Sequence, residues 1–233
     1  MKSILFNTEN VRAILEGRKT VTRRVVKLPT NIYPQDNGLY TLYADGTCYE
    51  NQHIKELEQY LRRPYKAGDV LYVRETWRWL PCFECGRDLR AVPCKEGKFN
   101  HTYGNTGCYA FKADIHNCGK DCFNWKPSIH MPKEAARIFL KVTGVRVERL
   151  QDICNSGSLQ DHVTNIAREG LQLQAVMENY QVLIDDFKQL WNSTIEKEQL
   201  NKYGWYANPY VWVIEFERIT PEQNRQAYLL SLP

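Results

Sequence analysis

The stretch Gly17-Arg18-Lys19-Thr20-Val21-Thr22-Arg23-Arg24 gathers one glycine, two hydroxyls and four cations into eight residues. Ahead of it, apolar residues recur at helical spacing over residues 8–16, and Thr8 is a good N-terminal cap for such a helix. Gly17 suits the left-handed position that follows a helix end. The β-branched residues after it favour an extended backbone. The sequence therefore predicts a short helix, a tight exit and then a strand or loop that carries the cations.

The residue types of this stretch also suggest chemistry. A lysine near a threonine can take the hydroxyl proton if burial or neighbouring cations lower the lysine pKa. Arg18, Arg23 and Arg24 would supply such cations around Lys19 and Thr22. The same cluster of amines and hydroxyls can instead bind an anion. A solvated basic loop is the third possibility, because short basic runs are common on protein surfaces.

The pattern Gly17-x-Lys19-x-x-Thr22-x-Arg24 resembles the G-x-K-x-x-[TE]-x-R signature of the ASCH domain, a family of PUA-like β-barrels. Further segments resemble that family in the same order along the chain: a central strand over residues 68–77, a strand over 146–150 with an acidic segment at 167–170, and a closing strand over 212–217. Residues 128–132 resemble the larger ASCH proteins carried by phages and prophages. The resemblance implies an α+β fold, a PUA-like (ASCH) mixed β-barrel with peripheral helices and a Cys-rich insertion.

A length of 233 residues predicts one domain with insertions, or at most two small domains. The resemblance implies one domain over residues 1–233, interrupted by insertions at about 29–65 and about 79–126. In the first insertion, residues 39–43 and 47–49 read as a hairpin around the turn signal Asp45-Gly46. Residues 52–62 read as a polar helix that stops before Pro64.

Elsewhere the residue patterns predict helices over residues 159–168 and 175–191, where the second carries a core-packing stripe. They predict strands over residues 109–113, over 138–147 with a break at Gly144, and over 210–217.

Some small ASCH proteins remove acyl groups from N4 of cytidine, and the resemblance carries their catalytic residues over to Lys19, Thr22 and Glu169. Lys19 would draw the proton from Thr22, the Thr22 hydroxyl would attack the amide carbonyl, and Glu169 would deliver a proton to the leaving amine. Arg24 or backbone amides would hold the oxyanion. Many ASCH proteins carry glutamate at the position that corresponds to Thr22. A glutamate cannot serve as this hydroxyl nucleophile, whereas a threonine can. Glu148 and Asp161 are alternatives for the Glu169 role.

A non-catalytic binding module of phage origin is the alternative function, with a nucleoside, single-stranded RNA or a modified base as the partner. Arginines would contact phosphates, and the aromatic side chains of Trp77, Trp79, Trp205 and Tyr206 would stack on a base, unless they are ordinary core residues. A ribonuclease with His130 as its acid or base is a third reading. The predicted substrate-binding residues are Gly17, Arg18, Arg23, Arg24, Arg74, Glu75, Trp77 and His130. For Arg74 and Glu75, a structural ion pair on the sheet is the alternative.

The chain has eight cysteines, and four of them form two pairs within the second insertion. Cys82 and Cys85 form a C-x-x-C-G knuckle, and Cys118 and Cys122 form a looser pair with three residues between them. Two such pairs fit a structural zinc site of four thiolates, and free thiols are the alternative. Zinc would supply folding energy to an insertion with few apolar residues. No organic cofactor is expected.

Composition restricts the setting of the protein more than its activity. A hydrophobic content of 43% supports a real core, and a formal charge of +4 permits nucleic-acid contact without requiring it. The sequence has no apolar run of about 18 residues and no signal-peptide pattern at its N-terminus. We therefore expect a cytoplasmic protein without a membrane partner. Protein partners and oligomeric state are left unassigned.

Overall fold

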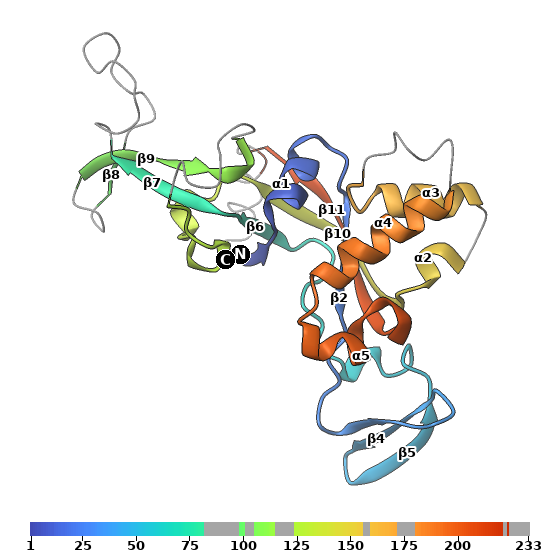
Figure 1. Ribbon diagram of the computed structural model, residues 1–233. Helices are drawn as coiled ribbons and strands as arrows, with labels where there is room; N and C mark the ends of the chain where they lie inside the picture. Colours follow the sequence, from blue (N-terminus) through green and yellow to red (C-terminus); the bar gives the residue numbers. More distant parts are fainter. Residues whose placement is uncertain are drawn as a thin grey trace, which may run out of the picture. The chain divides into compact units, whose positions relative to one another are not determined.

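The computed structural model describes residues 1–81, 98–100, 105–114, 124–155, 159–171, 180–220 and 223, of which 98–100, 105 and 159–161 are described by their backbone only (Figure 1). These residues form a mixed α+β fold with three β-sheets. The chain divides into two compact units. Unit 1 comprises Met1–Leu15, Val70–Leu140 and Ile219–Pro233, and unit 2 comprises Glu16–Asp69 and Lys141–Arg218.

Unit 1 is built on a parallel strand pair and an antiparallel sheet. Strand β1 (Lys2–Leu5) pairs with β6 (Val70–Arg74), and helix α1 (Thr8–Leu15) follows β1. The second sheet has the order β7-β9-β8, formed by Trp77–Pro81, Asn105–Phe111 and Lys98–Asn100. The described residues of this unit also form the short 3-10 helices η2 (Lys112–Asp114), η3 (Ser128–His130) and η4 (Lys133–Ala135). The core of this unit contains Trp77, Trp79, Phe111, Met131 and Ala135.

Unit 2 holds the strand that carries the basic stretch. Strand β2 (Val21–Val25) pairs antiparallel with β11 (Tyr210–Ile219), so that Ile214 lies opposite Thr22. β10 (Phe139–Arg149) lies next to β11 in the largest sheet, whose strand order is β1-β6-β10-β11-β2. In this order β1 and β2 are the two ends, and no closed barrel is found among the described residues.

Most of the described helices of unit 2 follow β10 along the chain. They are α2 (Asp152–Asn155), α3 (Leu159–Ala167), α4 (Tyr180–Ser193), η6 (Lys197–Gln199), α5 (Leu200–Tyr203) and η7 (Trp205–Ala207). α3 and α4 pack against each other (Figure 1). One face of β2 and β11 is buried against these helices in a core that contains Val21, Leu183, Phe187, Trp191 and Val213.

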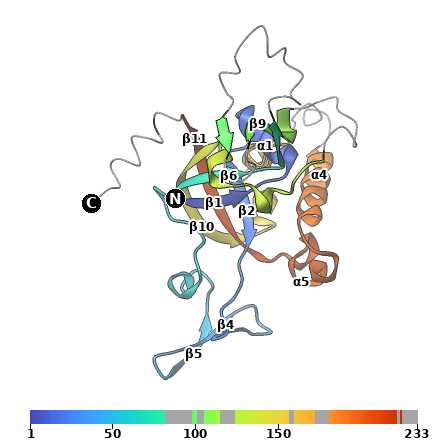
Figure 2. The same cartoon turned by 90° about the vertical axis from the view of Figure 1, so that its left-hand side faces the viewer.

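The first predicted insertion forms a separate small sheet of unit 2. Strands β3 (Ile32–Pro34), β4 (Tyr40–Ala44) and β5 (Thr47–Gln52) are antiparallel neighbours, which confirms the predicted hairpin. The turn uses Asp45 and Gly46, both of which have positive φ angles. In both views the β4–β5 hairpin projects away from β10 and β11 (Figure 2).

The helix predicted over residues 52–62 is wrong. Only the 3-10 helix η1 (Glu58–Tyr60) forms there, after a series of turns. Most of its backbone bonds span three residues, as between the Glu56 amide and the His53 carbonyl. The buried side chains Ile54, Leu57 and Leu61 anchor the segment, so burial of three apolar groups decides its path.

Two strand boundaries also differ from the prediction. β10 runs through Gly144 without a break. The glycine allows a close approach of the Glu215 side chain, because a Cβ there would lie 3.2 Å from Oε2 of Glu215. The strand predicted over residues 68–77 ends at Arg74, and Trp77 begins β7 in a different sheet. The helices predicted over residues 159–168 and 175–191 correspond to α3 and α4, although residues 172–179 are outside the described part of the chain.

No helix among the described residues is long and apolar enough to cross a membrane.

Candidate functional site

Backbone contacts bring the start of β2 against the end of α3. Lys19 and Glu169 form an isolated antiparallel bridge. The amides of Thr20 and Val21 both donate to the carbonyl of Arg168, at 2.9 and 3.1 Å. Two segments about 150 residues apart are thereby fixed side by side.

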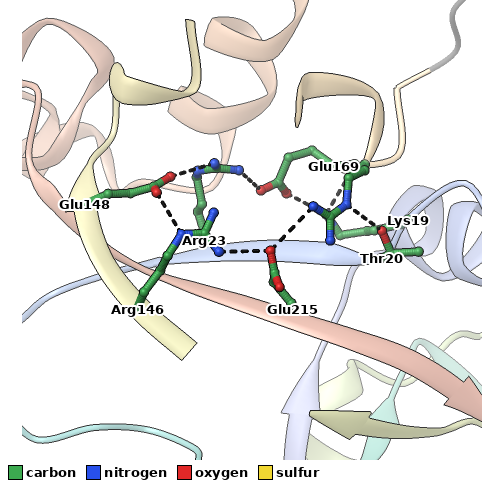
Figure 3. Close-up of polar contacts among 8 residues, drawn as sticks. Lys19, Thr20, Arg23, Arg146, Glu148, Glu169 and Glu215 are labelled. Atoms are coloured by element: carbon green, nitrogen blue, oxygen red, sulfur yellow. Dashed lines mark hydrogen bonds and ion pairs between the residues drawn. The ribbon is translucent and has the colours of Figure 1, made fainter. Parts of the chain in front are cut away.

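Lys19 and Glu169 form a buried ion pair, with 3% and 4% of the two residues exposed. Nζ of Lys19 donates to Oε2 of Glu169 and to the Glu169 carbonyl, both at 2.8 Å. The second carboxylate oxygen, Oε1, accepts from Nη1 of Arg23 at 2.6 Å (Figure 3). One carboxylate thus serves two cations, each on its own oxygen.

The network continues along β10 and β11 as alternating charges. Nη2 of Arg23 donates to Glu148 at 2.8 Å, and Glu148 also accepts from Arg146 at 3.1 Å. Arg146 in turn donates to Glu215 at 2.8 Å (Figure 3). Arg168 is the last member of this network. It contacts Glu215 at 3.4 Å and donates a 3.2 Å hydrogen bond to the hydroxyl of Thr20.

The ion pairs fix the charge of Glu169. Burial alone would raise its carboxyl pKa, but Lys19 and Arg23 outweigh burial and hold the pKa below its usual range. For Lys19, burial lowers the amine pKa, Arg23 and Arg24 lower it further, and Glu169 only partly opposes them. Glu169 is therefore ionised at neutral pH, and Lys19 is an amine whose proton is held less tightly than usual. Loss of that proton would leave Glu169 paired with Arg23.

Thr22 is buried in β2, with 5% of the residue exposed. Alternation along the strand places Thr22 and Arg24 on the face opposite Val21 and Arg23. Among the described residues, no hydrogen bond joins the Thr22 hydroxyl to Lys19. The structure thus brings Lys19 and Glu169 into contact, and Thr22 follows three residues after Lys19 on the adjoining strand.

Gly17 and Arg18 shape the entry to β2. Gly17 has the predicted left-handed conformation, with φ of +76°. Nε of Arg18 donates to Glu16 at 2.7 Å, and its Nη1 donates to the carbonyl of Gly170. Within unit 2, Arg18 therefore joins the segment that leads into β2 to the residue Gly170 that follows α3.

The other predicted binding residues belong to unit 1. Arg74 donates to the carbonyls of Met131 and Ile129. Glu75 is buried, and Arg137 binds both of its carboxylate oxygens, at 2.9 and 3.1 Å. Burial raises the pKa of Glu75, and Arg137 opposes that shift. The structure pairs Glu75 with Arg137, and a role for either residue in binding stays a prediction.

The aromatic candidates differ in exposure. Trp77, Trp79 and Trp205 are buried core side chains, whereas Tyr206 is 79% exposed with Nζ of Lys188 4.5 Å from its ring centroid. The tryptophans therefore pack as ordinary core residues. His130 lies exposed on η3 of unit 1.

The predicted zinc ligands Cys82, Cys85, Cys118 and Cys122 lie outside the described residues. Within the described part, no group of three or more His, Cys, Asp or Glu side chains is arranged to hold a metal. The zinc site stays a prediction.

Sequence reasoning missed Arg146, Arg168 and Glu215 as members of the network, and Glu148 entered only as an alternative acid. A signal was present on β10, where Arg146 and Glu148 are two residues apart and therefore share one face of the strand. Their partners lie on other strands and helices, and sequence spacing does not indicate such pairs.

No protein-family model matches this chain, and no curated protein or solved structure is significantly similar to it.

Proposed function

We propose that this chain is an ASCH-type amidohydrolase that cleaves N4-acylated cytidine-type amides, with Lys19 as base and Thr22 as nucleophile. The observation that carries the proposal is the buried Lys19 amine, held by Glu169 and with a pKa lowered by burial. A base near neutral pH needs such a lowered pKa. The order of the strands that carry the signature supports a PUA-like arrangement, because β2 pairs with the closing strand β11.

The proposed reaction has two steps with one proton carrier. Neutral Lys19 accepts the Thr22 proton through intervening water. The hydroxyl oxygen attacks the amide carbonyl, and the resulting tetrahedral oxyanion collapses as the carbon–nitrogen bond breaks. The Lys19 ammonium returns the proton to the leaving amine of cytidine. Water, activated by the same amine, then hydrolyses the threonine ester and releases the acid.

Glu169 is assigned a positioning role in this scheme. An ionised carboxylate cannot donate the proton that the family resemblance led us to expect from it, and the pKa of Glu169 is held low by two cations. Its two contacts with Nζ of Lys19 orient the amine instead. Arg23 keeps Glu169 paired through each protonation state of Lys19.

The first test is release of cytidine from N4-acetylcytidine by the purified chain, beside the variant Lys19→Met. We expect turnover by the wild type and a loss of at least about 100-fold in kcat/KM for Lys19→Met, since general acid–base catalysis contributes about 100- to 10,000-fold. Circular dichroism confirms that the variant is folded. Absence of turnover by the folded wild type, or unchanged turnover by the variant, would contradict the proposal.

A second candidate is non-catalytic binding of a nucleoside or of a base in single-stranded RNA. It is favoured by the position of Thr22, whose hydroxyl makes no hydrogen bond to Lys19 among the described residues. In this case N4-acetylcytidine would bind to the wild type without being cleaved, and Lys19→Met would weaken its binding. Calorimetric titration alongside the turnover assay distinguishes the two functions.

A further inference from the structure

Unit 2 contains a pocket of about 470 Å³ that is separate from the Lys19–Glu169 network. Its volume lies within the roughly 300–1,000 Å³ of small-molecule sites. The residues that give it chemical character are Lys27, Arg149 and Lys202, with Tyr40, Tyr203 and Tyr210. They come from the end of β2, the first insertion, the end of β10, α5 and the start of β11, and none of them belongs to the network.

The charges of this pocket have one sign. Lys27, Arg149 and Lys202 are the charged residues among the described residues that line it, and no carboxylate does so. Lys27 and Lys202 are exposed, so their ammonium groups are accessible to a ligand from solvent. Three cations without a counter-charge favour an anionic ligand.

Arg149 is held against an aromatic ring. Its guanidinium carbon lies over the Tyr210 ring, 3.8 Å from the ring centroid, which is a cation–π contact. Nη1 donates to the carbonyl of Asn208 at 3.0 Å. Asn208 has a left-handed backbone conformation, with φ of +44°. Its side-chain oxygen accepts a hydrogen bond from the backbone amide of Gln151 at 2.9 Å. One hydrogen bond and the contact with Tyr210 therefore hold the Arg149 guanidinium beside the ring without a ligand.

Tyrosines provide the aromatic surface of the pocket, beside the aliphatic lining residues Val26, Leu28, Pro34, Ala207 and Pro209. Tyr40 is 7% exposed, and its ring centroid lies 6.1 Å from that of Tyr210. Burial raises the pKa of the Tyr40 phenol, and Arg149 only opposes this, so Tyr40 remains an uncharged hydrogen-bonding group. Tyr203 is half-buried at the side of the pocket, with Nζ of Lys202 5.2 Å from its ring centroid. The pocket thus places aromatic rings next to the cationic groups of Arg149 and Lys202.

We propose that this pocket binds a nucleotide, with the base stacked on the Arg149–Tyr210 pair and Tyr203, and the phosphate bound by Lys27 and Lys202. Nucleobases stack on aromatic rings and on guanidinium planes, and phosphates pair with lysine ammonium groups. A free mononucleotide and one nucleotide unit of a single strand share this chemistry. The inference is independent of the amidohydrolase activity, because it uses none of the network residues.

The test is calorimetric titration of the full chain with cytidine 5′-monophosphate, cytidine and inorganic phosphate. We expect the nucleotide to bind at least about tenfold more tightly than cytidine or phosphate alone, because only the nucleotide combines charged hydrogen bonds to its phosphate with stacking of its base. The double variant Lys27→Met/Lys202→Met should weaken nucleotide binding by at least about tenfold and leave cytidine binding nearly unchanged. Both lysines are exposed, so the variant should fold.

Lys188→Met is the matched control, because Lys188 also lies over a tyrosine, Tyr206, but neither residue lines the pocket. It should bind the nucleotide as the wild type does. Binding of phosphate as tight as that of the nucleotide, or a double variant equal to the wild type, would overturn the proposal. A short oligocytidylate that binds more tightly than the mononucleotide identifies the polymer as the source, and the reverse identifies the free nucleotide.

Discussion

At the scale of single residues, Glu169 has the most constrained environment in the candidate site. Its carboxylate is buried, and its two oxygens serve Lys19 and Arg23 separately. Burial of a charge costs several kcal/mol per ion unless partners offset it, so buried Glu169 depends on its two cationic partners, and they depend on Glu169. Removal of the shared anion therefore differs in consequence from removal of one of its two cations.

We predict that Glu169→Gln destabilises the protein by about 3–5 kcal/mol at pH 7, because the buried Lys19 loses its counter-ion. Lys19→Met should cost no more than about 2 kcal/mol, because Glu169 keeps Arg23 and methionine fills the volume of the lysine stem. Urea unfolding of the two variants beside the wild type measures the difference.

The acid dependence of stability provides the control for that comparison. Glu169 has a folded-state pKa below its ordinary value of 4.5, so its contribution is fully present above that pH and is lost as the pH falls through the folded-state pKa. The stability gap between wild type and Glu169→Gln should therefore narrow on acidification. A gap that stays constant, or a larger loss for Lys19→Met than for Glu169→Gln, would show that this account of the ion pair is wrong.

The sequence identified residues of the candidate site by their type and motif position, but it did not identify which side chains form ion pairs with one another. The family pattern singled out Lys19 and Glu169, and the structure places them in contact. Arg23 was expected to touch substrate, yet its guanidinium bonds Glu169 and Glu148. These partners lie more than 100 residues away in the chain, and no spacing in the sequence relates them to Arg23.

At the scale of elements, the start of α1 differs from the sequence expectation by one residue. Oδ1 of Asn7 accepts from the amide of Asn10 at 2.9 Å, and the Asn7 carbonyl accepts from the amide of Val11. This is the hydrogen-bonding pattern of an N-cap residue. The predicted cap, Thr8, makes no side-chain hydrogen bond within the described residues, so the expectation that it caps the helix is wrong.

We predict that Asn7→Ala lowers the free energy of unfolding by about 1 kcal/mol, since an asparagine cap contributes about 0.5–2 kcal/mol. Thr8→Ala is the matched control and should change stability by less than about 0.5 kcal/mol, as a surface substitution without a lost bond. Thermal or urea unfolding checks both variants. If Thr8→Ala were the more harmful of the two, the cap assignment would fail.

Elements with strong periodicity could be predicted, and elements shaped by a few contacts could not. The striped segment at α4 and the alternating hairpin β4–β5 follow from their patterns alone. Residues 52–62 also place the buried side chains Ile54, Leu57 and Leu61 at helical spacing, yet the segment forms turns and one 3-10 helix, so that spacing alone does not decide its structure. Gly144 looked like a strand breaker, although its function is to leave space for the Glu215 carboxylate.

At the scale of the whole molecule, the resemblance to a known family predicted an α+β fold, and the described residues form a mixed α+β fold. The strand order β1-β6-β10-β11-β2 combines segments from both ends of the sequence, and local propensity does not determine such an order. The sequence does indicate that the cations of the basic stretch have polar partners, because buried polar side chains on a strand are almost always hydrogen-bonded. Which partners they find depends on the complete fold.

The central claim is that Thr22 is the nucleophile that Lys19 activates, and the most direct test compares two threonines of the same stretch. Thr22→Val keeps the shape of the residue but removes the hydroxyl, and Thr20→Val does the same to a hydroxyl whose observed role is to accept a bond from Arg168. For N4-acetylcytidine, we predict that Thr22→Val lowers kcat/KM at least about a thousandfold, as loss of a nucleophile does in other hydrolases.

Thr20→Val should stay within about fivefold of the wild type, because it loses one hydrogen bond of about 1 kcal/mol. Turnover by Thr22→Val that equals turnover by Thr20→Val would contradict the claim.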